Sequence, residues 1–211
     1  MKIINSFQLA MAIMVFTVAI VLPIYGNAQK KSTSTSLDPK LLASKFSGDY
    51  LDKVQNFKLT DSSGNQMSLS DFKGKLVFAD LWYSGCGACI TTNKGIRTVH
   101  DSLANQDIVF LSISVDKSRE IWMQSITPGS LKTKTNPWAG MYVASKGTIM
   151  LYTSGRGHDN DFRKYYVPLN SYPKLLLFDK NGLLIAETPP RPDVEPGKLI
   201  EYLNKYQIME R

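Results

Sequence analysis

The amino-acid sequence predicts an α/β protein built on a mixed sheet, and three stretches of the chain carry this prediction. Residues 76–82 and 108–115 are nearly continuous apolar runs, typical of strands covered on both faces, and an amphipathic helical pattern lies between them. Farther along, residues 174–178 and 183–186 flank the turn sequence Asp-Lys-Asn-Gly. The first two runs predict a parallel β-α-β unit, and the third stretch adds an antiparallel pair.

Shorter elements are expected around these stretches. The turn-forming residues 61–65 join two short alternating segments, which predicts a β-hairpin at the start of the domain. Helices are expected at about residues 117–126 and 159–166, and Pro196 opens a final helix whose apolar residues share one face. Among the glycines and prolines of the middle of the chain, residues 148–152 form a candidate strand.

The N-terminal part of the chain has a different character. Residues 7–25 carry no charged side chain, and small residues follow at the positions that a signal peptidase reads. We expect residues 1–28 to be a cleaved secretory signal peptide; the alternative is an uncleaved membrane anchor, since the run approaches the ~20 residues of a spanning helix. Residues 29–45 are expected to be a flexible tether to a domain at residues 46–211. That domain would lie in the periplasm or on the outer face of the cytoplasmic membrane.

The charge of the chain is positive but dispersed. The formal net charge is +7, and the lysines and arginines are scattered along the sequence. They do not interleave with aromatic residues in a stripe, as nucleic-acid-binding surfaces often require. The basic residues therefore predict solvated faces, and no nucleic-acid partner is expected.

The number and spacing of the cysteines indicate a chemical role rather than a structural one. The chain has two cysteines, Cys86 and Cys89, whereas an exported domain that used disulfides as scaffold would carry more of them. A bridge across so short a loop stabilises a fold by only about 2 kcal/mol in the chain-entropy model. The helical pattern places Cys89 on the inward-facing stripe of its helix and Cys86 one turn earlier, at the helix start, where we expect it to meet solvent.

Such a pair suits thiol–disulfide exchange. A helix N-terminus stabilises a thiolate at Cys86, and a thiol one turn away, at Cys89, can resolve a mixed disulfide. The alternatives are half of a zinc site and a pair of core cysteines. Zinc would need further ligands, and the only histidines are His100 and His158, both expected at the surface. No metal or cofactor is therefore expected.

Residues 78–89, with the sequence Phe-Ala-Asp-Leu-Trp-Tyr-Ser-Gly-Cys-Gly-Ala-Cys, resemble the strand and active-site segment of the thioredoxin-like superfamily. Further segments are similar to its exported TlpA/ResA-like branch: residues 59–75, 112–116, 172–182 and 188–192. The resemblance implies a thioredoxin-like three-layer sandwich, with a central mixed sheet, an N-terminal β-hairpin extension and a central insertion at residues 127–157. It also implies thiol-disulfide oxidoreductase activity. The chain departs from the pattern at Gly85, where relatives often have tryptophan.

The resemblance implies a catalytic role for Asp80, which stands six residues before Cys86 and matches a buried acid of the superfamily. A carboxylate in an apolar strand is costly, so burial raises its pKa. Near neutral pH, Asp80 could then move a proton to and from Cys89. The alternative is a structural acid that is satisfied by its neighbours.

The resemblance also implies a substrate-binding surface made by Trp82, Tyr172 and Pro173. Trp82 matches the aromatic residue beneath the active site, where packing is its expected contribution. Pro173 matches a cis-proline that faces the disulfide and turns the backbone groups of Tyr172 outward, toward a strand of the substrate. An ordinary trans proline in a loop is the alternative.

The expected function is that of an exported reductant of protein disulfides outside the cytoplasm, which a membrane-borne partner would reduce again. Two alternatives remain open. A peroxiredoxin-like peroxide reductase would have threonine three residues before the attacking cysteine, where this chain has Tyr83. A copper-binding metallochaperone would use the two thiols and His158, although its cysteines are usually one residue farther apart.

Overall fold

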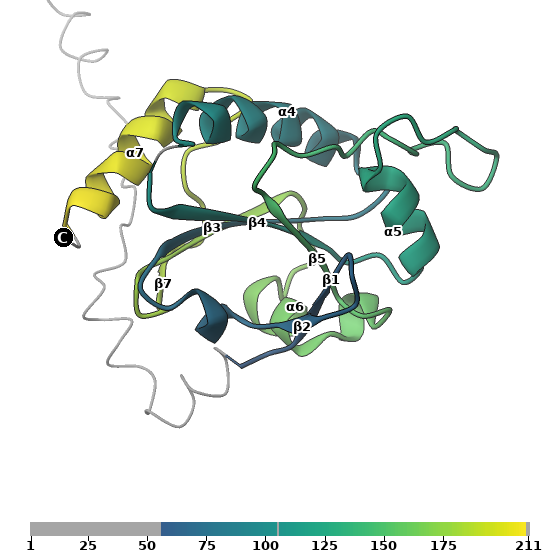
Figure 1. Cartoon of the computed structure of the whole chain (residues 1–211), viewed down its shortest axis with the longest axis horizontal. Helices are drawn as coiled ribbons and strands as arrows, with labels where there is room; N and C mark the ends of the chain where they lie inside the picture. Colours follow the sequence, from purple (N-terminus) through teal and green to yellow (C-terminus); the bar gives the residue numbers. More distant parts are fainter. Residues whose placement is uncertain (1–55, 105, 210–211) are drawn as a thin grey trace, which may run out of the picture. The chain divides into compact units, whose positions relative to one another are not determined.

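The computed structural model describes residues 56–104 and 106–209. The predictions for residues 1–28 and 29–45, and for the start of the domain at residue 46, lie outside these residues. In chain order the elements are β1 (Leu59–Asp61), β2 (Gln66–Met67), the 3-10 helix η1 (Leu69–Phe72), β3 (Leu76–Trp82), α4 (Gly87–Ser102), β4 (Ile108–Ser114), α5 (Arg119–Ile126), β5 (Ile149–Tyr152), the 3-10 helix η2 (Gly157–Asp159), α6 (Asp161–Tyr166), β6 (Lys174–Phe178), β7 (Leu184–Ala186) and α7 (Pro196–Met209) (Figure 1). Within the described part of the chain, no helix combines the length and the apolar character needed to cross a membrane.

The strands form one mixed sheet in the order β2-β1-β5-β4-β3-β6-β7. β3 and β4 are parallel, while β6 and β7 form the predicted antiparallel pair, and β6 also runs antiparallel to β3. The N-terminal hairpin of β1 and β2 is also present. β5 pairs parallel with β4 and antiparallel with β1. Part of the expected insertion at residues 127–157 is therefore an integral strand of the sheet, and it connects the hairpin to the strands at the centre.

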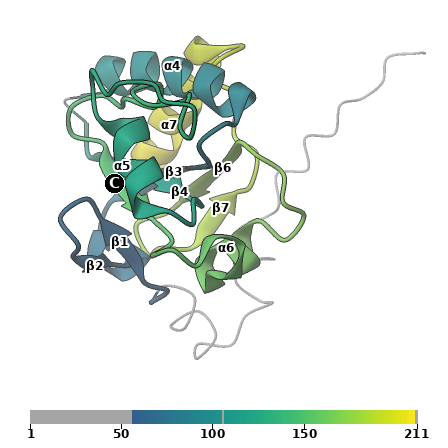
Figure 2. The same ribbon diagram turned by 90° about the vertical axis from the view of Figure 1, so that its right-hand side faces the viewer.

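Helices cover the two faces of the sheet and complete the expected three layers. α4 and α7 lie together on one face, and α6 lies on the other (Figures 1 and 2). All seven residues of β3 are buried. Because side chains alternate along a strand, Leu76 and Phe78 pack toward α4 and α7, whereas Val77 and Leu81 pack into the opposite core.

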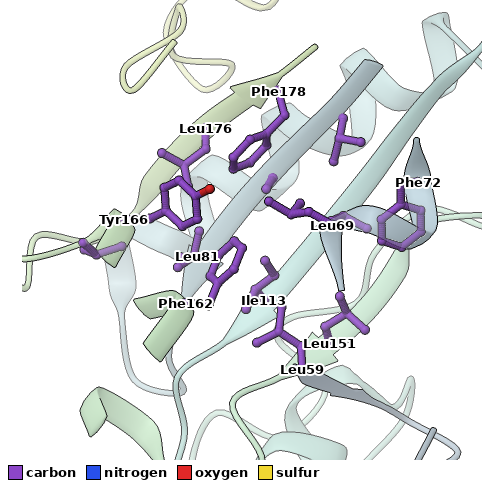
Figure 3. Packing of buried hydrophobic residues seen from close by; sticks show 14 residues of the cluster. Leu59, Leu69, Phe72, Leu81, Ile113, Leu151, Phe162, Tyr166, Leu176 and Phe178 are labelled. Carbon is purple, nitrogen blue, oxygen red and sulfur yellow. The ribbon is translucent and has the colours of Figure 1, made fainter. Parts of the chain in front are cut away.

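The core on the α6 side joins the sheet to that helix (Figure 3). Phe162 and Tyr166 of α6 pack against Leu81, Leu176 and Phe178. The rings of Tyr166 and Phe178 meet edge to face, with centroids 5.2 Å apart. This packing fixes α6 against the sheet, and α6 in turn supports part of the site described below.

Replacement of Phe178 by alanine tests this core. Phe178 is fully buried, so Phe178→Ala should lower the free energy of unfolding by about 3–5 kcal/mol through lost burial and a residual cavity. Guanidinium unfolding of the oxidised protein measures the change. Leu169, which is 88 % exposed, supplies the control, and Leu169→Ala should change stability by less than about 0.5 kcal/mol. Equal effects of the two substitutions would contradict the packing.

Candidate active site

Cys86 and Cys89 lie at the start of α4, where the chain leaves β3, and they are joined by a disulfide. Cys86 is the N-cap residue, and its Sγ atom accepts a hydrogen bond from the backbone N–H of Cys89 at 3.1 Å. This N–H points along the helix axis toward the sulfur. Such an orientation is expected where the free N–H groups of a helix N-terminus stabilise a thiolate. A thiolate at Cys86 would therefore be stabilised by the N-terminus of α4.

The exposure of the two sulfurs differs from the prediction at one of them. Cys89 is fully buried, as its place on the inward stripe indicated. Cys86 was expected to meet solvent, yet it is only 6 % exposed, so that expectation is wrong. The reason is a cluster of large side chains that packs with both cysteines: Trp82, Trp122, Tyr142 and Tyr152.

A polar network holds the loop that carries Cys86. The carboxylate of Asp116 accepts hydrogen bonds from the backbone N–H of Ser84 at 3.0 Å and from its hydroxyl at 2.8 Å. Ser114 donates to the same carboxylate at 2.6 Å, and the hydroxyls of Ser84 and Ser125 lie 2.8 Å apart. Sequence reasoning missed Asp116 in this role. The available signal was its position just after β4, since parallel neighbouring strands end at the same edge of a sheet.

Gly85 occupies a position that other residues would fit poorly. Its φ angle is +95°, in the region that favours glycine. A side chain here would also meet Trp138, because the indole Nε1 lies 3.1 Å from the place of a Cβ atom. An indole from the segment between α5 and β5 therefore covers the residue next to Cys86.

Asp80 is a buried residue of β3, the strand that leads to the loop with Cys86. It is 2 % exposed, and its Oδ2 atom accepts a hydrogen bond from the Tyr142 hydroxyl at 2.9 Å. Burial raises the pKa of Asp80 to about 7, and the hydrogen bond from Tyr142 opposes part of that rise. The indole of Trp82 stacks on the ring of Tyr142 and donates to Ser112 at 2.8 Å. Asp80 is thus a carboxyl group that can gain or lose a proton near neutral pH.

The peptide bond between Tyr172 and Pro173 is cis, as the resemblance implied. The hydroxyl of Tyr172 accepts a hydrogen bond from Nε of Arg163 at 3.2 Å and lies 3.5 Å from Nδ1 of His158. The Tyr172 ring meets the edge of the Tyr83 ring, with centroids 5.5 Å apart. α6 and the turn before it therefore hold Tyr172 in place, and Tyr172 also packs against the cluster around the disulfide.

The two histidines differ from each other in their surroundings. His158 is exposed, as expected, although it lies beside Tyr172. His100 was expected at the surface and is instead 9 % exposed, with its ring 4.8 Å from that of Phe110, so this expectation is wrong. Among residues 56–104 and 106–209, no three or more His, Cys, Asp or Glu side chains gather as a metal ion would require.

Comparison with known proteins agrees with this geometry. Residues 51–136 match the AhpC/TSA family. Thiol-disulfide oxidoreductase ResA from Bacillus thuringiensis is 25 % identical over 153 residues, which make up 72 % of this chain and 76 % of that protein. ResA from Bacillus subtilis is 30 % identical over 64 residues, or 30 % of this chain and 36 % of the relative.

Solved structures show the same likeness. A Bacteroides vulgatus protein described as a thiol-disulfide oxidoreductase superposes with a TM-score of 0.52 at 26 % identity, covering 70 % of this chain and 91 % of its own. A thiol-disulfide oxidoreductase from Bacteroides fragilis, at 21 % identity and a TM-score of 0.52, shares the fold over 69 % of this chain and 96 % of its own.

The fold and the paired cysteines define a thiol-disulfide oxidoreductase with the thioredoxin fold. Over residues 51–136 the chain is similar to the AhpC/TSA family, and the ResA thiol-disulfide oxidoreductases are among its relatives.

The raised pKa of Asp80 predicts how stability depends on pH. Between its ordinary pKa of 3.8 and the value of about 7, the folded protein holds a proton that the unfolded chain releases. Asp80 therefore lowers the stability of the oxidised protein as pH rises through this window. Asp80→Asn should be more stable than the natural protein at pH 8, by up to about 4 kcal/mol, with the gain fading toward pH 4.

Guanidinium unfolding at pH 4, 6 and 8 measures this gain. Asp107→Asn is the matched control, because Asp107 is an exposed carboxylate and its surface ion pair with Lys75 contributes little to stability. A gain in Asp80→Asn that did not vary with pH would contradict the protonation of Asp80 in the folded protein.

Proposed function

We propose that this protein is an exported reductant that passes two electrons from the thiols of Cys86 and Cys89 to disulfides of other proteins. The observation that carries the proposal is the position of Cys86 at the N-cap of α4, where its sulfur accepts the N–H of Cys89. The two cysteines of the chain stand within reach of each other, as a cycle between dithiol and disulfide requires.

In the first step the Cys86 thiolate attacks one sulfur of a substrate disulfide. The substrate S–S bond breaks, its second sulfur leaves and takes a proton, and Cys86 becomes part of a mixed disulfide. The N-terminus of α4 supports this step because it favours the thiolate over the thiol.

In the second step Cys89 resolves the mixed disulfide. Cys89 is fully buried, so its proton needs an acceptor inside the protein, and we assign that role to the ionised form of Asp80. The Cys89 thiolate attacks Sγ of Cys86, the bond between Cys86 and the substrate breaks, and the substrate sulfur leaves as a thiolate that takes a proton from solvent. Asp80 then releases the proton of Cys89 to water. The substrate gains two electrons and two protons in all, and the protein is left with the Cys86–Cys89 disulfide.

The substrate surface is proposed to lie around the cis peptide bond. The backbone groups of Tyr172, just before Pro173, would pair with an extended segment of the substrate. Tyr83, which is 40 % exposed, offers an aromatic face beside Tyr172. Trp82 is fully buried, so it would act on the substrate only through the packing beneath the disulfide. Because Cys86 is 6 % exposed, a flexible or partly unfolded substrate segment suits this site best.

Export is supported by the amino-acid sequence. The uncharged residues 7–25, followed by small residues, suit a secretory signal peptide or a membrane anchor. Outside the cytoplasm, a reductant that ends its cycle as a disulfide has to be reduced again. We propose that a membrane-borne partner supplies these electrons.

Trapping of substrates tests the roles of the two cysteines. In Cys89→Ala, the mixed disulfide at Cys86 cannot be resolved, so disulfide-linked complexes with reducible protein substrates should accumulate on non-reducing gels. Cys86→Ala should form none, and the double variant is the control for non-specific thiol chemistry. Both single variants should also lose the dithiothreitol-dependent reduction of insulin. Equal trapping by both single variants would overturn the assignment of Cys86 as the nucleophile and Cys89 as the resolving thiol. Rapid consumption of hydrogen peroxide by the natural protein would favour the peroxidase alternative.

A further inference from the structure

The segment between α5 and β5, residues 127–148, supplies a side chain to the buried side of the site. Tyr142 lies in this segment and is 2 % exposed. Its backbone N–H donates to the carbonyl of Ser125 at 2.9 Å, and the carbonyl of the next residue, Val143, accepts a hydrogen bond from Asn93 at 3.1 Å. Hydrogen bonds to α5 and α4 therefore fix the backbone on both sides of the Tyr142 side chain.

The ring of Tyr142 is fixed as well. It stacks on the indole of Trp82, with centroids 3.4 Å apart and planes inclined by 6°. This contact directs the phenol hydroxyl to Asp80, where it donates to Oδ2 at 2.9 Å. Burial and the neighbouring carboxyl of Asp80 raise the pKa of Tyr142 well above its ordinary value, so the phenol stays protonated and remains a donor.

The second oxygen of Asp80 has different surroundings. Oδ1 accepts no hydrogen bond from the described residues. Asp80 borders a cavity of about 10 Å³, about the space that one water molecule needs. Polar side chains of α4, β4 and the segment after Tyr142 line this cavity: Asn93, Ser112, Ser145 and Thr148. The two oxygens are therefore inequivalent, since Oδ2 is occupied by a donor and Oδ1 is left to carry a proton.

We propose that Tyr142 is a positioning residue that sets the proton affinity of Asp80: its hydroxyl holds Oδ2, and Oδ1 exchanges its proton with Cys89 and with a water in the adjoining cavity. The exchange with Cys89 rests on the proposed function, whereas the effect of Tyr142 on Asp80 does not. A bound phenol donor stabilises the carboxylate and would keep its proton exchangeable near neutral pH despite complete burial.

Among the described residues, few other charged or titratable groups face Asp80 and Tyr142. Cys89 of α4 packs with Trp82 and Tyr142 in the cluster around the disulfide, and Arg97 of α4 lines the cavity beside Asp80. Asp116, after β4, contributes a repulsion that also keeps Tyr142 protonated. Of these groups, Tyr142 alone has a hydrogen bond to Asp80 among the described residues.

Tyr142→Phe tests the proposal, because it removes the hydroxyl and retains the ring that stacks on Trp82. The hydroxyl stabilises the charged form of Asp80, so its loss should raise the Asp80 titration midpoint by about one pH unit or more. The midpoint is read from the side-chain carboxyl ¹³C shift of Asp80 in the oxidised full chain, and Asp80→Asn assigns the signal. Tyr152→Phe is the matched control, because Tyr152 stacks on Trp122 in the same cluster, and it should leave the midpoint unchanged.

A second substitution keeps the test independent of any loss of folding in Tyr142→Phe. 3-Fluorotyrosine placed at position 142 is a stronger donor of nearly the same shape, so the Asp80 midpoint should fall. A midpoint that is unchanged in both proteins, or that moves equally in Tyr152→Phe, overturns the proposal. The titration needs no exchange activity. Failure of substrate trapping with an intact midpoint shift would therefore reject the proposed function and leave the role of Tyr142 standing.

Discussion

β3 runs through the middle of the sheet with all seven residues buried. The packing of the helices on both faces of the sheet and the position of the disulfide depend on the burial of this strand. Its pairing with β4 and β6 leaves no open edge, so both faces must be filled by side chains from helices on either side. The strand ends at Trp82, and the chain then enters the loop that carries Cys86. The rigidity of a fully buried strand therefore sets the position of the disulfide.

The burial of β3 also determines the pKa of Asp80. A carboxyl group in a strand without solvent is expensive to ionise, which raises the pKa of Asp80 to about 7. The molecule offsets part of this cost with one phenol hydroxyl, from Tyr142. Three parts of the chain that are distant in sequence meet here: the start of α4, the segment before β5 and the cis peptide bond at Pro173. α6 completes the arrangement through the hydrogen bond from Arg163 to Tyr172.

Local patterns in the sequence predicted the strands of the sheet because periodicity and turn chemistry are local properties. The bounds of β3 and β6 agree with the apolar runs that predicted them. The place of β5 and the contacts of Tyr142 depend on long-range packing of a segment rich in glycine and proline, which has no periodic signal. The burial of Cys86 arises from that same packing. For His100 a signal was present, because it stands four residues after Ile96, on the inward side of α4.

The equilibrium reduction potential of the Cys86–Cys89 pair tests the central claim most directly. The protein would be equilibrated at pH 7 in dithiothreitol and glutathione buffers, and its thiols quantified by alkylation. An exported reductant predicts a reversible two-electron transition toward the thioredoxin end of the known range, roughly −270 mV. A value near the strongly oxidising end, roughly −120 mV, would contradict this account and indicate a protein that inserts disulfides.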